Sequence, residues 1–361
     1  MLGRARQDLD SARTHLAKME NFEGGTGQLG WCLDGHKAAY RTLSDWLGKL
    51  ADPTVSGAST AVADSASYYE RTDAASAANL DATYPDTNVT EYKEDTGYLD
   101  IESEGSARFA DVVTPGKYLT EPHNYGNELY GNELDWWDSL SVMSLAGMAI
   151  QRVSEVAVWL GWLDKPYHPM KELAEHFVGD WAGARAAADI LRNVGRSVNY
   201  IGLNIQWAAQ GTEQVWHGNA GDGATVYLMN LARRFDADNA WPPIDTLAQQ
   251  YVDASEDMMK LRDAAVGVLN SIGDYAVEAA IACGVGGSAA STGVGTPIAV
   301  AAVLYVGYKI ARVVDGIAEL FDIIGKLKTA TSALIAAQNG FAGPGRLTLP
   351  ALPAAPIEVP R

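Results

Sequence analysis

The chain has 361 residues, of which 47% are hydrophobic and 20% charged, enough for a substantial core and one or two domains. Its formal net charge of −18 argues against a general affinity for nucleic acid or anionic lipid. Cys32 and Cys283 lie far apart and fit neither a zinc site nor a disulfide framework, so we interpret both as buried apolar side chains. The first residues, MLGRARQDLDSARTHL, lack the apolar stretch of a cleavable signal peptide, so the general export rules predict a cytoplasmic protein unless a leaderless route is used.

Residues 1–80 are rich in alanine and predicted to be helical. The dipeptide Asp52-Pro53 predicts a break, because the residue before a proline is disfavoured in the α conformation. The break separates an expected helix near 28–51 from another near 57–80. We expect these two helices to form a short antiparallel hairpin.

Residues 81–135 have a different composition, with 13 Asp or Glu against 3 Lys or Arg and scattered proline and glycine. This composition is typical of an acidic linker or a long surface loop. The pentapeptide YGNEL occurs at 125–129 and again at 130–134. Two copies are too few for a solenoid, so a local duplication in a solvated loop or a partner-binding motif are the two interpretations.

From residue 138 onward, apolar residues recur every three or four positions, over 140–163 and again over 177–215. The same spacing continues from Ile244 to Tyr275 and from Ile310 to Leu334, as in the apolar seam of coiled-coil-like helices. The glycine-rich sequence at 284–297 lies between the last two and predicts the tip of a long antiparallel hairpin. No segment has a strand pattern. We therefore expect an all-α fold, an elongated antiparallel helical bundle with coiled-coil-like long helices.

Motifs that carry chemistry are missing from the sequence. The six histidines form no HExxH motif and no pair with cysteine at ligand spacing, and no GxSxG elbow or Walker loop occurs. The sequence GVGGSA at 284–289 matches a dinucleotide fingerprint in spelling, but a predicted helix precedes it where a strand is required. We therefore predict no enzymatic activity, no catalytic residue, no metal and no cofactor.

Residues 279–308 contain no charged residue, which raises the question of membrane contact. Glycine, serine and alanine dilute the hydrophobicity of this segment, whereas a spanning helix needs about 20 mainly apolar residues. Two interpretations stay open: a helical hairpin whose tip is buried or exposed, and conditional insertion into a membrane. The candidate tip residues are Gly284, Gly286, Gly287, Gly293 and Gly295.

The sequence VWHGNAGDGA at 215–224 is explained as a turn between two helices. Gly218 suits a left-handed position at the end of the first helix, and Asn219 or Asp222 suits the cap of the second. Trp216 is expected to lie across the end of the bundle. Every residue in the turn then has a structural task without any chemistry.

This turn is similar to the W-x-G pattern of the WXG superfamily of type VII (ESX) secretion substrates, through Trp216 and Gly218. The sequence GDWAGARAAADILRNV at 179–194 is similar to the first helix of actinobacterial members. Gly221 and Gly223 replace alanines of the family pattern, and we expect them to loosen the start of the second helix.

A second motif, YERTD at 69–73, matches the YxxxD export signal of the same family through Tyr69 and Asp73. The two residues are one helical turn apart and share a face. In that family the WxG turn and the YxxxD motif meet at one end of the bundle as a composite signal.

The order of the motifs resembles the fused PE/PPE-like architecture of EspB-like proteins over residues 1–280. The resemblance implies a PE-like helical hairpin over 1–80, the acidic linker or loop over 81–135 and a PPE/WXG-like bundle over 136–280. We expect the remainder to form a glycine-rich tip and C-terminal heptad helix at 281–340 and a Pro-rich tail at 341–361.

What the resemblance implies is a leaderless type VII secretion substrate, secreted or at the cell surface of an actinobacterium, non-enzymatic and a homo-oligomer. Tyr69, Asp73, Trp216 and Gly218 would form the signal read by the secretion ATPase or a dedicated chaperone. There are two alternatives: a membrane-active or pore-forming effector that uses 279–308, and the N-terminal delivery domain of a WXG-type polymorphic toxin.

Overall fold

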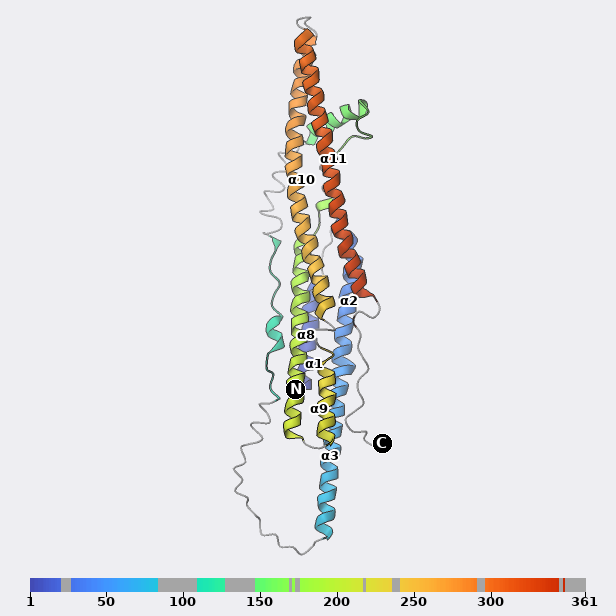
Figure 1. Ribbon diagram of the computed structural model, residues 1–361, viewed down its shortest axis with the longest axis vertical. Helices are drawn as coiled ribbons and strands as arrows, with labels where there is room; N and C mark the ends of the chain where they lie inside the picture. Colours follow the sequence, from blue (N-terminus) through green and yellow to red (C-terminus); the bar gives the residue numbers. More distant parts are fainter. Residues whose placement is uncertain are drawn as a thin grey trace.

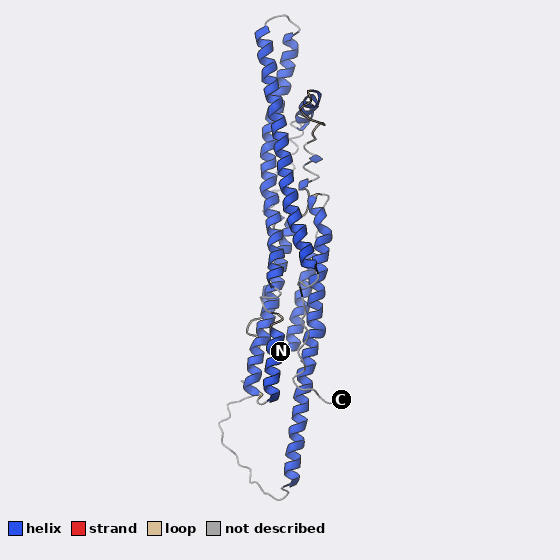
Figure 2. Ribbon diagram, turned by 45° about the vertical axis from the view of Figure 1, so that its right-hand side comes forward, coloured by secondary structure: helices blue, strands red, loops and turns tan. Residues whose placement is uncertain are grey.

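The computed structural model describes residues 1–20, 27–83, 109–126, 147–168, 171–172, 176–216, 219–235, 241–290, 296–343 and 347. Most of these residues are helical and none of them lies in a strand, which confirms the predicted all-α class. Figures 1 and 2 show the long helices running along a common axis, with few elements across it.

The N-terminal part contains three helices joined by short helical turns. Its elements are α1 (Leu2–Leu16), η1 (Ala17–Met19), η2 (Gln28–Cys32), α2 (Leu33–Lys49), η3 (Leu50–Val55) and α3 (Ser56–Thr83). Leu9, Ala12 and Leu16 of α1 are fully buried at the three- and four-residue spacing of one helix face. Helix α1 packs against α8, α2, the η3 turn and α3.

The predicted hairpin between 28–51 and 57–80 is wrong, although the break at Asp52 is real. Asp52 has an extended backbone (φ −136°, ψ 124°), and the residues on either side of it are helical. Reversing a chain between two helices takes about two to five loop residues. A single extended residue does not achieve this, and α3 continues in the direction of α2 (Figures 1 and 2).

The C-terminal two thirds contain four further labelled helices, three of them the longest in the described part of the chain, which confirms helices in the segments predicted from apolar spacing. They are α8 (Trp181–Val215), α9 (Asn219–Ala232), α10 (Trp241–Ala290) and α11 (Thr296–Ala342). A further helix covers 147–159, within the helix predicted over 140–163; residues 140–146 lie outside the described part. Asp180 caps the start of α8, where its carboxylate accepts a hydrogen bond from the amide of Gly183 at 2.7 Å.

Helix α10 continues further into the glycine-rich sequence than its composition suggests. Gly284, Gly286 and Gly287 lie in its last turns, whereas Gly293 and Gly295 are outside the described residues. Each glycine in a helix costs about 1 kcal/mol relative to alanine. Because extending an existing helix is far easier than starting one, α10 continues through these glycines. The end of α10 and the start of α11 lie together at one extremity of the molecule (Figure 1).

A buried polar network ties α2, α10 and α11 together. The His36 Nε2 lies 2.7 Å from the carbonyl of Met19 and therefore carries the hydrogen that it donates. Nδ1 of the neutral ring then accepts a hydrogen bond from the Tyr251 hydroxyl (2.6 Å). The Gln338 side-chain amide donates a second hydrogen bond to the same hydroxyl oxygen (2.9 Å). Burial lowers the pKa of His36, which favours this neutral form.

Part of the predicted acidic linker or loop is a segment docked on the bundle. Residues 109–126, called here the docked segment, include the short helix η4 (Pro115–Tyr118) and pack on α8 and α1. The Asn204 amide of α8 accepts from the backbone amides of Val112 (3.0 Å) and Val113 (3.3 Å) and donates to the Val113 carbonyl (2.8 Å). Tyr118 stacks on Tyr200 with ring centroids 4.4 Å apart.

The acidic linker or loop over 81–135 stays a prediction. Its described residues 109–126 lie against α8, where the Asn204 side chain supplies hydrogen-bond partners for their backbone. The YGNEL repeat lies outside the described residues except for Tyr125 and Gly126. Of the predicted tail over 341–361, residues 341–343 and Leu347 are described. The domain boundaries drawn from the sequence stay predictions.

Candidate functional site

The structure brings together the aromatic residues of the two sequence motifs. Tyr69 of α3 and Trp216 at the end of α8 lie edge to face, with ring centroids 6.1 Å apart and planes inclined by 66°. An aromatic pair of this geometry contributes about 0.5–1.5 kcal/mol beyond the area it buries. Tyr69 remains 38% exposed, so the pair is reachable from solvent.

Trp216 is positioned by the way α8 ends. Its backbone leaves the helix in an extended conformation (φ −125°, ψ 104°), while its amide still donates to the Thr212 carbonyl at 2.9 Å. Its partners in the predicted turn, His217 and Gly218, lie outside the described residues.

Gly221 allows α9 to start directly beneath Trp216. A Cβ atom at this position would lie 1.8 Å from the Trp216 carbonyl oxygen, so a side chain there is sterically impossible without moving the turn. Gly221 therefore permits close backbone approach, and the expected loosening of the helix start stays a prediction. In the sequence, the signal for this close approach is a glycine at a position where the family pattern has alanine.

Asp73 lies one helical turn beyond Tyr69 and is exposed. On a helix these two positions share a face, so a partner that covers the Tyr69 ring also reaches the Asp73 carboxylate. The structure thus places an aromatic pair and an exposed carboxylate at one end of the bundle.

An open apolar groove of about 360 Å³ lies beside Trp216, where α1, α3, the docked segment, α8 and α9 meet. Among its lining residues are Leu2, Val62, Ala66, Phe109, Trp216 and Leu228. We call it the proximal groove. The sequence did not predict it, because its walls come from segments separated by more than two hundred residues.

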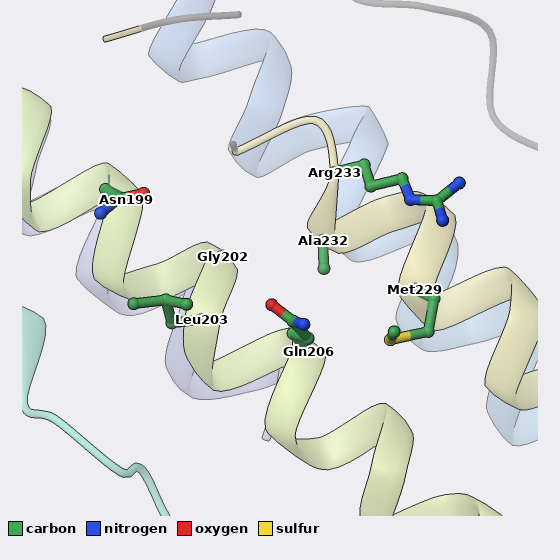
Figure 3. A pocket seen from close by; sticks show the side chains of 7 residues that line it. All are labelled: Asn199, Gly202, Leu203, Gln206, Met229, Ala232 and Arg233. Carbon is green, nitrogen blue, oxygen red and sulfur yellow. The ribbon is translucent and has the colours of Figure 1, made fainter. Parts of the chain in front are cut away.

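A second hollow, of about 210 Å³, lies between α8 and α9 (Figure 3). The Gln206 amide points into the space between the two helices, whereas the Arg233 side chain extends away from it (Figure 3). The rest of its lining consists of Asn199, Gly202, Leu203, Met229 and Ala232. With no carboxylate, histidine or cysteine among these residues, the hollow offers no acid–base or nucleophilic pair.

The described part of the chain contains no group of three or more His, Cys, Asp or Glu side chains placed to hold a metal ion. Burial raises the pKa of the Cys32 thiol to about 12, so this cysteine stays a protonated, unreactive thiol. Cys283 lies in α10, at a position whose side chain is outside the described part. The predicted lack of enzymatic activity stays a prediction.

Comparison with known proteins adds no further assignment to this geometry. No family model, curated protein or solved structure matches this chain. The functional interpretation therefore depends on the motifs and on the positions of their residues.

Proposed function

We propose that this chain is a leaderless substrate of a type VII (ESX) secretion system, a non-enzymatic helical protein delivered to the surface or exterior of an actinobacterial cell. The observation that carries the proposal is the contact between Tyr69 and Trp216. The WXG resemblance requires the YxxxD and WxG motifs to meet, and their aromatic residues come from helices far apart in the sequence. Gly218 completes the motif in the sequence.

In this proposal Tyr69, Asp73, Trp216 and Gly218 form one recognition surface for the secretion ATPase or a dedicated chaperone. The ring contact limits the rotamers of both aromatic side chains, so less conformational entropy is lost when the partner binds. The exposed Asp73 carboxylate supplies a charge that a basic group on the partner can pair with.

The finer fold class belongs to the same proposal: an elongated antiparallel bundle with coiled-coil-like long helices. Two ion pairs between α8 and α10 support the antiparallel direction. Arg185 pairs with Glu256 at 3.0 Å and Arg192 with Asp245 at 3.2 Å, so residue numbers rise on one helix as they fall on the other. As in the EspB-like resemblance, we propose that such bundles associate as homo-oligomers.

A secretion assay in an actinobacterial host with an ESX system tests the proposal. We expect Tyr69→Ala and Asp73→Ala to accumulate inside the cell. Tyr68→Ala and Asp64→Ala, which change the same residue types on the same helix, are expected to be exported like the wild type. Circular dichroism of the purified variants checks that helicity is unchanged. Normal export of folded Tyr69→Ala together with normal export of Trp216→Ala would contradict the proposal.

A further inference from the structure

The two charged residues that flank the uncharged sequence 279–308 form an ion pair with each other. Glu278 on α10 and Lys309 on α11 approach to 2.5 Å, and the Tyr305 hydroxyl donates to the same carboxylate at 2.7 Å. Lys309 is buried although it is charged. The pair therefore marks a boundary on the hairpin, with charged helices on one side and no charge on the other.

Three tyrosines surround the ion pair at this boundary. The Lys309 ammonium lies 4.7 Å from the ring centroid of Tyr275, 5.2 Å from that of Tyr305 and 5.8 Å from that of Tyr308. We call these three tyrosines with Glu278 and Lys309 the tyrosine collar. Tyrosine rings with a polar end are enriched at the boundary between hydrocarbon and water in membranes.

On the uncharged side of the collar, large aliphatic side chains point into solvent. Ile281 is 62% exposed on α10, and Val303 and Leu304 are 71% and 69% exposed on α11. Val303, Leu304 and Tyr305 are consecutive, so their exposed side chains cover about 200° of the helix circumference. A protein partner covers one face of a helix, whereas lipid surrounds it, and a helix that is apolar all round belongs in a core or a membrane.

The length of this uncharged end matches one leaflet of a bilayer. At about 1.5 Å per residue, α10 extends about 18 Å from Glu278 to Ala290, and α11 about 20 Å from Thr296 to Lys309. Half of the hydrocarbon core is about 15 Å thick. In agreement, none of the described helices has a stretch both long and apolar enough to cross a membrane.

We propose that the uncharged end of the α10–α11 hairpin inserts into one leaflet of a lipid bilayer as far as the tyrosine collar. The Lys309 charge is already paired with Glu278, and the chain as a whole carries −18, so anionic headgroups offer no attraction. The preferred surface is therefore zwitterionic lipid, held by apolar contact. Insertion of this kind goes beyond export and does not depend on it.

Flotation of the purified full chain with phosphatidylcholine vesicles tests the proposal. The wild type is expected to float with the vesicles, and addition of phosphatidylglycerol is expected to weaken binding. Leu304→Glu is expected to lower the bound fraction about tenfold or more, because a charge replaces an inserted aliphatic group. Val226→Glu on α9 is the matched control, since Val226 is a similarly exposed aliphatic residue outside the hairpin, and it is expected to bind like the wild type.

The same samples give the outcomes that would overturn the proposal. Failure of the wild type to float, or equal flotation of Leu304→Glu, would show that the exposed aliphatic residues do not enter lipid. The wild type could also fail to float while light scattering shows a dimer that Leu304→Glu dissociates into monomers. In that case a second copy of the chain covers this surface instead of lipid. Retention of an entrapped dye during binding is expected for insertion into one leaflet, and release of the dye would point to a pore.

Discussion

The two extremities of the molecule use apolar residues in opposite ways. At one end α1, α3, α8, α9 and the docked segment meet, and Trp216 lies among their side chains next to Tyr69. At the other end, α10 and α11 alone form the extremity among the described elements (Figure 1), and Val303 and Leu304 are largely exposed. The amino-acid types are similar, but the number of neighbouring elements differs.

Apolar residues enclosed by several elements stabilise the fold, whereas those at the hairpin end form an exposed surface. A side chain enclosed by several elements loses its water and contributes stability. Val303 and Leu304 on the hairpin are not covered by any other described element and remain exposed to water. The aromatic contact at the first end and the aliphatic surface at the second are therefore expected to respond differently to substitution.

Replacing a tryptophan of the enclosed core is expected to destabilise the fold far more than replacing an exposed residue of the hairpin end. Trp181 is fully buried where α8 begins, and Trp181→Ala is expected to lower the free energy of unfolding by about 3–5 kcal/mol. Leu304→Ala is expected to change it by less than about 0.5 kcal/mol. Guanidinium denaturation followed by circular dichroism measures both. Equal effects would mean that the hairpin end is packed in solution and that the comparison fails.

A smaller effect is expected at the turn that positions Trp216. Gly221→Ala places a Cβ against the Trp216 carbonyl and is expected to destabilise the fold by about 1–3 kcal/mol and to change the near-ultraviolet signal of the tryptophan. Gly267→Ala on α10 is the matched control, because a Cβ there meets no atom within 4 Å. Alanine favours a helix over glycine, so the control is expected to be neutral or stabilising. A stable Gly221→Ala with an unchanged tryptophan signal would remove this account of the turn.

The smallest expected effect concerns pH and His36. Burial lowers the pKa of His36 in the folded state below its value in the unfolded chain. Its contribution to stability is therefore full above the unfolded pKa, about 6.5, and is lost as the pH falls below it. His36→Gln does not titrate, so the difference in unfolding midpoint between wild type and variant should narrow from pH 7 to pH 5. A difference that stays constant or widens would show that His36 does not titrate in this way.

The sequence was most informative where a pattern is local. The apolar spacing from Ile244 to Tyr275 and from Ile310 to Leu334 predicts α10 and α11, because helix periodicity depends on neighbours three and four residues apart. The WxG turn was predicted for the same reason, since α8 ends and α9 begins on either side of it. The contact between Tyr69 and Trp216 followed only from the family resemblance.

Other features depend on partners distant in the sequence and could not be predicted. The docked segment is held by Asn204, whose amide meets Val112 and Val113 about ninety residues away. His36 gave no signal of its bond to Tyr251. The hairpin across Pro53 was wrong because a proline rule locates a break but does not set the direction in which the chain continues.

Comparing two tryptophans in or directly after the C-terminal part of α8 tests whether Trp216 is part of an export signal. The measurement is the ratio of secreted to intracellular protein for Trp216→Ala and Trp207→Ala in the same host. Trp207 is 46% exposed on α8 and belongs to neither motif. We expect Trp216→Ala to be retained in the cell while Trp207→Ala is secreted like the wild type. Secretion of a folded Trp216→Ala variant at the wild-type ratio would contradict it.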